Sequence, residues 1–257
     1  AGTSTVQADS RQIKVADINN DGHEDILVAN LGSNTVSVRL SDGAGNLSGS
    51  NNVSVGTQPH DLVVADFNSD GHLDFATANF GSNNVSIRLG NGTGAFANGN
   101  TLNAGVQPTN IITGDFNKDG YTDLAVTNGG AANASVFLGN GAGNFSTAPT
   151  VSAGNGAVHL VAEDFNQDGN TDLALLNQTA NSISIRLGNG NGGFTNGATL
   201  TTGSNPRVVV SADFDGDGRA DLATINSGSG NVSVFYGLGN GQFGHTRTFT
   251  TSPFPLG

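Results

Sequence analysis

The sequence contains no cysteine, no methionine and no tryptophan among its 257 residues. Without cysteine the chain can form no disulfide framework and carry out no thiol chemistry. It contains no apolar run near the roughly 18 residues that a membrane-spanning helix needs, so we expect no membrane insertion. The chain begins with alanine rather than methionine, as a secreted protein does after losing its signal peptide, or as a trimmed chain does.

Aromatic residues (6%) and charged residues (12%) are also scarce, whereas glycine is abundant, with 39 residues. This composition is typical of many short strands that are joined by tight turns. Apolar residues do not recur at intervals of three to four positions, so we expect no amphipathic helix. The sequence therefore predicts an all-β protein.

One nine-residue stretch, residues 66–74 (DFNSDGHLD), occurs in five versions along the chain. Its first aspartate stands at positions 17, 66, 115, 164 and 213, so each step is 49 residues. Every copy has an oxygen-bearing side chain at loop positions 1, 3, 5 and 9 and glycine at position 6. Such a loop can wrap a hard cation, because alternate side chains turn their oxygens inward and glycine permits the sharp bend.

A single copy of this motif is often only a turn, since aspartate, asparagine and glycine all favour tight loops. A turn, however, needs no carboxylate three residues after its glycine, and all five copies have one. We therefore predict one Ca²⁺ in each loop, about five in all. The predicted side-chain ligands are Asp17, Asn19, Asp21, Asp25, Asp66, Asn68, Asp70, Asp74, Asp115, Asn117, Asp119, Asp123, Asp164, Asn166, Asp168, Asp172, Asp213, Asp215, Asp217 and Asp221.

The charge balance supports metal sites. Of the 21 acidic residues, 16 lie at the predicted ligand positions, and the formal net charge is −12. Five Ca²⁺ ions would add +10 and leave −2. The acidic residues are thus concentrated in the loops and do not form a general acidic surface. An acidic chain also argues against nucleic acid as a partner. Weak calcium loops suit millimolar extracellular calcium, so we expect a secreted or cell-surface protein.

The repeats run at approximately 8–56, 57–105, 106–154, 155–203 and 204–252, and we expect a single domain over 1–257. Each contains four segments that predict strands. The first two, such as 62–65 and 75–78, are continuous runs and predict strands that are buried on both faces. The third alternates, which predicts a half-buried strand, and the fourth is polar like an edge strand.

Burial is therefore expected to fall from the first strand to the fourth, as in a radial sheet whose first strand lies nearest an axis. Four short antiparallel strands at a period of 40 to 50 residues predict a β-propeller of five blades. The arginines of the third strand are expected on a solvated rim; they are Arg39, Arg88 and Arg186. Glu163 replaces a small residue of the first strand and is expected to face a wet central channel.

Glycine-rich turns link the third and fourth strands and end in an apolar residue. We predict that these residues plug the space between neighbouring blades; they are Leu47, Phe96, Phe145, Phe194 and Phe243. The residues after the first loop aspartate should pack in the same way; they are Ile18, Phe67, Phe116, Phe165 and Phe214. Either residues 3–6 or residues 248–251 can complete the last blade, and Phe249 favours the C-terminal segment.

The aspartate loop, followed by a strand and a glycine-rich turn ending in phenylalanine, resembles the FG-GAP/VCBS repeats. These repeats build the propeller heads of integrin α chains, certain fungal lectins and many bacterial surface proteins. The resemblance implies that calcium lies between strands one and two of each blade. It also implies that a backbone carbonyl at loop position 7 completes the ligand set, at His23, His72, Tyr121, Asn170 and Arg219. Many such propellers have six or seven blades, so five repeats can close a ring or belong to a longer array.

Two classes of function fit these observations. The first is a non-catalytic interaction or adhesion module, stiffened by calcium and expected to be a monomer. It would bind a protein or glycan on the face opposite the metal loops, through residues 58–60, 79–83, 107–109 and 205–207. The second is a multivalent lectin with sugar pockets between blades. The fungal relatives favour a lectin, whereas the lack of tryptophan and the presence of only two tyrosines count against it.

An enzyme is the third class, and the sequence predicts none. No Ser/His/Asp order, zinc spacing or nucleotide-binding loop occurs. The carboxylate pairs fall at metal positions, which accounts for them without glycosidase chemistry. The five histidines are scattered and do not pair at metal-ligand spacing.

Overall fold

The computed structural model describes residues 6–251, and every regular element in that range is a β-strand. The strands form five antiparallel sheets in chain order, which we call blades one to five. Blade one holds β1 (Ser10–Ala16), β2 (Asp25–Asn30), β3 (Thr35–Ser41) and β4 (Leu47–Ser54). Blade two holds β5 (Pro59–Ala65), β6 (Asp74–Asn79), β7 (Asn84–Gly90) and β8 (Phe96–Asn103).

Blade three holds β9 (Pro108–Gly114), β10 (Asp123–Asn128), β11 (Asn133–Gly139) and a divided fourth strand, β12 (Phe145–Thr147) and β13 (Val151–Ser152). Blade four holds β14 (Ala157–Glu163), β15 (Asp172–Asn177), β16 (Ser182–Gly188) and β17 (Phe194–Thr201). Blade five holds β18 (Pro206–Ala212), β19 (Asp221–Asn226), β20 (Asn231–Gly237) and β21 (Phe243–Thr250). The break in blade three contains Pro149, which has no N–H to donate to the ladder.

This architecture confirms the predicted fold, an all-β propeller built from five blades of four antiparallel strands. The outer strand of blade five is β21, which pairs with β20, so the C-terminal segment completes the last blade as predicted. The alternative segment, residues 3–6, lies outside the described residues except for Val6. Between residues 6 and 251 no helix is long and apolar enough to cross a membrane.

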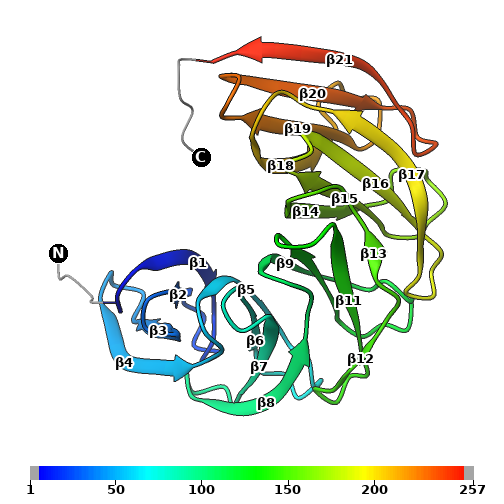
Figure 1. Cartoon of the computed structure of the whole chain (residues 1–257). Helices are drawn as coiled ribbons and strands as arrows, with labels where there is room; N and C mark the ends of the chain where they lie inside the picture. The colour runs from blue at the N-terminus through cyan, green and yellow to red at the C-terminus, as the bar shows by residue number, and fades with distance from the viewer. Residues whose placement is uncertain (1–5, 252–257) are drawn as a thin grey trace.

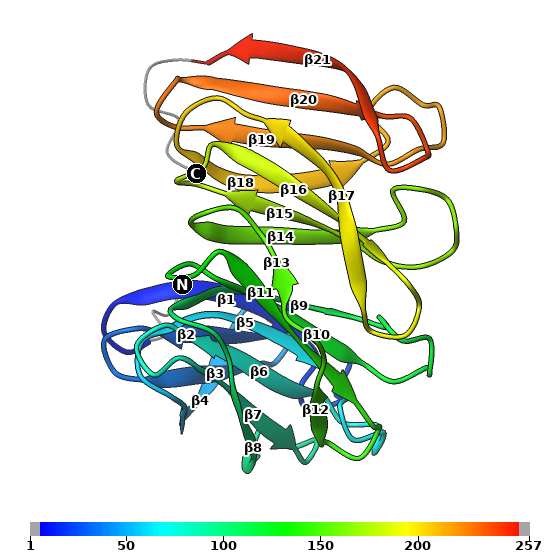
Figure 2. The same ribbon diagram turned by 45° about the vertical axis from the view of Figure 1, so that its right-hand side comes forward.

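The blades radiate from a common axis. The first strands β1, β5, β9, β14 and β18 contact one another in succession near the centre, and the fourth strands lie outside (Figure 1). In Figures 1 and 2 blade one and blade five do not meet, so the blades form an open arc and not a closed ring. The loops predicted to bind calcium, which we call the metal loops, follow the first strands on one face of the arc; they are residues 17–25, 66–74, 115–123, 164–172 and 213–221. The loops after the second strands lie on the opposite face.

Aromatic residues fill the space between successive blades as predicted, but the predicted plug Leu47 in blade one is 38% exposed. The ring of Phe67 in blade two meets Phe145 of blade three at a centroid distance of 5.5 Å. The same contact joins Phe116 to Phe194 at 5.9 Å and Phe165 to Phe243 at 5.7 Å. Each contact is accompanied by a backbone hydrogen bond from the glycine-rich turn to the carbonyl of the loop phenylalanine. The interface between blades is therefore repeated along the chain.

The two ends of the arc expose residues that are buried elsewhere. Phe214 in blade five is 45% exposed, whereas Ile18, Phe67, Phe116 and Phe165 at the same repeat position are 1–2% exposed. At the other end Ile13 is 54% exposed, whereas its counterparts in the later blades are 0–1% exposed; they are Leu62, Ile111, Leu160 and Val209. Each of these positions packs against an adjoining blade in the middle of the arc, and among residues 6–251 no further blade adjoins Ile13 or Phe214.

The predicted gradient of burial is wrong. The second strands are the most buried, and every residue of β6, β10 and β15 is buried. The first strands are only partly buried, because one side of each borders the axial space. A continuous apolar run therefore marks the middle of the blade better than its inner edge.

The predicted solvated rim is also wrong. Arg39, Arg88 and Arg186 are only 4–9% exposed. The Arg88 guanidinium reaches the preceding blade and donates to the carbonyl oxygen of Ser54 from Nε at 2.9 Å and from Nη2 at 2.7 Å. Arg186 donates from Nε to the carbonyl oxygen of Ser152 at 2.7 Å. Arg88 and Arg186 thus satisfy carbonyl groups at the interface between blades.

Candidate functional site

Each metal loop is closed by the aspartate at position 9, which begins the second strand. These five aspartates are fully buried; they are Asp25, Asp74, Asp123, Asp172 and Asp221. In blade two, Asp74 Oδ2 accepts the N–H of Phe67 at 2.8 Å and Oδ1 accepts the N–H of Gly90 at 2.7 Å. The carboxylate therefore ties the loop to the turn after the third strand, a role that the sequence interpretation did not include.

The other predicted ligands of the loop turn toward its interior. In blade two, Asp66 Oδ2 accepts the N–H of Gly71 at 2.9 Å, and Asp70 Oδ1 accepts the N–H of His72 at 2.9 Å. Asn68 Nδ2 donates to Asp70 Oδ2 at 2.9 Å. Gly71 has a φ of 85°, which glycine adopts without strain, and this bend lets the chain return toward Asp66.

Electrostatics within the loops is unfavourable without a cation. Burial raises the pKa of Asp74 to about 6, and repulsion from Asp70 and Asp66 adds to the effect. Burial likewise raises the pKa of Asp172 to about 6. Asp70 behaves in the opposite way, because the backbone N–H of His72 lowers the pKa of its carboxyl group. A divalent cation would offset this repulsion between neighbouring carboxylates.

The residues present fit calcium. In blade three, Asp115 Oδ1 is buried and has no hydrogen-bond partner among the described residues. In blade five, carboxylate oxygens of Asp213, Asp215 and Asp221 all lie within 4.8 Å of one another. Carboxylate and amide oxygens are the ligands that Ca²⁺ prefers. At position 7 the side chains of His72 and Tyr121 lie against the glycine-rich turns, so only their backbone carbonyls are available to the loop.

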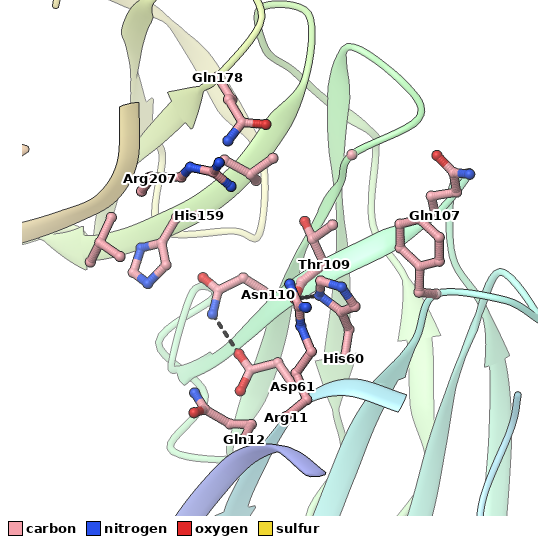
Figure 3. Close-up of a pocket in the computed structure, with 14 residues that line it drawn as sticks. Arg11, Gln12, His60, Asp61, Gln107, Thr109, Asn110, His159, Gln178 and Arg207 are labelled. Atoms are coloured by element: carbon pink, nitrogen blue, oxygen red, sulfur yellow. Dashed lines mark hydrogen bonds between the residues drawn. The ribbon is translucent and has the colours of Figure 1, made fainter. Parts of the chain in front are cut away.

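A second candidate site lies on the axis at the opposite end of the blades. This axial pocket has a volume of about 500 Å³ and receives residues from all five blades. His60, Phe80, Thr109 and Arg207, all in the segments that we predicted as the contact face, line it (Figure 3). A second axial cavity of about 470 Å³ shares His159 with it and extends to Glu163. Glu163 therefore faces the channel, as predicted.

Hydrogen bonds fix the floor of the axial pocket. Asp61 is 3% exposed, and its Oδ2 accepts a hydrogen bond from Asn110 Nδ2 (Figure 3). The same oxygen accepts the N–H of Ile111 at 3.1 Å. Asn110 Oδ1 accepts the N–H of Leu160 at 3.0 Å. These bonds join blades two, three and four across the axis. The sequence interpretation missed Asp61, because only the fold brings it opposite Asn110.

Burial disfavours the charged form of two histidines of the axial pocket, His60 and His159. Burial lowers the pKa of His60, and nearby Arg11 acts in the same direction. The His60 ring stacks on Phe80 at a centroid distance of 5.1 Å. Burial also lowers the pKa of His159. The Nδ1 atom of His159 is buried and has no hydrogen-bond partner among the described residues.

The fold and the loops define a propeller built from aspartate-loop repeats. The family model described as "FG-GAP-like repeat" matches residues 17–77, 66–126, 115–175 and 164–224, which is more than half of the chain. The chain therefore belongs to the FG-GAP-like repeat family. Among curated proteins no relative matches the sequence.

Solved structures share the fold at low identity. An Agrocybe aegerita lectin that recognises non-reducing terminal N-acetylglucosamine is 20% identical (TM-score 0.61; 96% of this chain, 67% of the lectin). A proposed 6-phosphogluconolactonase from Bacteroides uniformis is 16% identical (TM-score 0.69; 94% and 71%). A periplasmic gluconolactonase from Pseudomonas aeruginosa is 18% identical (TM-score 0.67; 92% and 70%). At these identities the likeness shows the fold alone.

The gluconolactonases contradict the prediction that this chain is not an enzyme. That prediction rested on the absence of familiar catalytic motifs in the sequence. The same fold occurs in proteins named as lactonases, so a missing linear motif does not exclude catalysis in a propeller. The physical reason is that a site on the axis is assembled from one or two residues of each blade and leaves no linear motif.

Proposed function

We propose that this chain is a calcium-binding interaction propeller that works outside the cell, with one Ca²⁺ in the metal loop of each blade. Its ligand, a protein or a glycan, binds on the face opposite the metal loops. The observation that carries the proposal is the convergence of carboxylate oxygens in the loops, best seen at Asp213, Asp215 and Asp221, whose oxygens lie within 4.8 Å of one another. The unpaired Asp115 Oδ1 supports it.

Calcium bound in these loops would stabilise the fold, because the ligands converge only in the native chain. The measurement is the melting temperature in excess EGTA and in millimolar Ca²⁺, with millimolar Mg²⁺ as the control for ionic strength and divalent charge. We expect a higher melting temperature in Ca²⁺ than in either other condition. An unchanged melting temperature would contradict the proposal.

A lectin is the second candidate. Tyr121 lines a cavity of about 430 Å³ beside the metal loop of blade three, and Tyr236 lines one of about 370 Å³ in blade five. Aromatic rings in cavities are common in ligand sites. A glycan array tests this reading, with Tyr121→Ala as the variant. Loss of a glycan signal in Tyr121→Ala favours the lectin, and an array without signal counts against it.

A further inference from the structure

The residues that line the axial pocket differ from blade to blade. They fall at four positions of the 49-residue repeat, and one of these positions is occupied in turn by Arg11, His60, Thr109, Val158 and Arg207. By contrast, the last position of the second strand is asparagine in all five blades. The strand framework thus repeats closely from blade to blade, whereas the side chains around the axis vary. The wall of the pocket presents different groups on each side, as an asymmetric small molecule requires.

Two guanidinium groups reach this pocket from opposite ends of the arc. Arg11 comes from blade one and Arg207 from blade five, and Figure 3 shows both side chains at the pocket. The acidic lining residue, Asp61, is already engaged by three N–H donors, from Leu62, Asn110 and Ile111. Two guanidinium groups and one carboxylate give the pocket lining a formal charge of +1 (2 − 1), within a chain whose formal net charge is −12.

Neutral polar groups surround these charges. Gln12, Gln107 and Gln178 come from three different blades and carry amides that both donate and accept hydrogen bonds. The imidazole ring of His159 also lines the pocket. The volume of about 500 Å³ lies within the range of small-molecule sites.

We propose that the axial pocket binds a small polyhydroxylated organic anion, with Arg11 and Arg207 holding its carboxylate or phosphate and the amides holding its hydroxyl groups. This inference rests on the proposed function, which places the binding face opposite the metal loops. Arginine suits this role because its planar guanidinium pairs with carboxylate and phosphate in a bidentate manner.

The test is isothermal titration calorimetry of the calcium-saturated chain with D-glucuronate, glucose 6-phosphate and D-glucose. Glucuronate and glucose share a ring and differ at one carbon, so their comparison isolates the carboxylate. We expect at least one anion to bind about tenfold or more tightly than glucose. The preferred anion then identifies carboxylate or phosphate as the recognised group.

The double variant Arg11→Gln/Arg207→Gln should weaken anion binding about tenfold or more, since each charged hydrogen bond is lost. Both arginines are exposed, so the variant should fold. The control is Lys118→Gln, which removes a positive charge at an exposed site outside the axial pocket and should bind as wild type. Equal loss in both variants, equal binding of glucose, or no binding of either anion would overturn the inference.

Melting temperatures with EGTA and with Ca²⁺, measured on the same samples, separate this inference from the proposed function. A normal calcium shift without anion binding overturns the axial site alone. Anion binding without a calcium shift supports the axial site and contradicts the metal loops.

Discussion

Two phenylalanines at the same repeat position should differ widely in their contribution to stability. Phe165 is 2% exposed and packs on Phe243, whereas Phe214 is 45% exposed. Replacing a buried phenylalanine with alanine costs about 3–5 kcal/mol, because apolar contact is lost and a cavity remains. Phe214 already has nearly half of its surface in water, so Phe214→Ala should cost about 1–2 kcal/mol.

The assay is urea unfolding followed by far-UV circular dichroism, since the chain has no tryptophan to report by fluorescence. Both variants are measured with wild type in the same calcium buffer. A second matched pair compares Ile111→Val in the middle of the arc, where the side chain is 1% exposed, with Ile13→Val at the other end, where it is 54% exposed. The first should cost about 0.5–1.5 kcal/mol and the second much less.

Equal costs for Phe165→Ala and Phe214→Ala would refute this reasoning. Such a result would mean that Phe214 is covered in solution, and hence that blade five has a neighbour. Concentration-dependent stability would then identify that neighbour as a second copy of the chain, and concentration-independent stability would identify it as blade one.

Three further predictions address the turns, the axis and the metal loops. Gly192→Ala should destabilise the fold more than Gly45→Ala in urea unfolding. Both glycines have positive φ, but of the two only Gly192 would bring an added Cβ against a leucine of the preceding blade, at 2.8 Å. Equal losses of stability in the two variants would contradict this packing explanation. Burial lowers the pKa of His60 and His159 below 6.5, so the unfolded chain binds protons before the folded chain does as pH falls. The stability that the two neutral rings contribute is therefore complete above pH 6.5 and is lost below it. Between pH 7.5 and 5.5 the melting temperature of wild type should therefore fall more than that of His60→Gln/His159→Gln, and parallel falls would show that the rings do not titrate differently on folding. Asp119→Ala should remove one Ca²⁺ from the stoichiometry measured by calorimetry and leave the others bound, whereas loss of all binding would contradict independent loops.

Much of the blade could be predicted because it depends on local pattern. Aspartate and glycine at fixed loop positions, alternation along the third strand and glycine-rich turns recur every 49 residues, and each has the same local consequence wherever it occurs. The strands, the turns and the aromatic plugs follow from these patterns. The aspartate loops also follow from spacing, and their occupancy by calcium stays a prediction.

The tertiary structure decided what depends on neighbours. Arg88 looked solvent-facing by alternation, but the adjoining blade supplies a carbonyl group and buries it. Phe214 has the same local sequence context as Phe165, yet it is exposed because no blade covers it. The axial pocket exists only because the fold brings residues 49 apart, such as Asp61 and Asn110, to one axis. The sequence of each repeat thus determines its local interactions, whereas the burial of its residues and the assembly of the sites depend on the neighbouring blade.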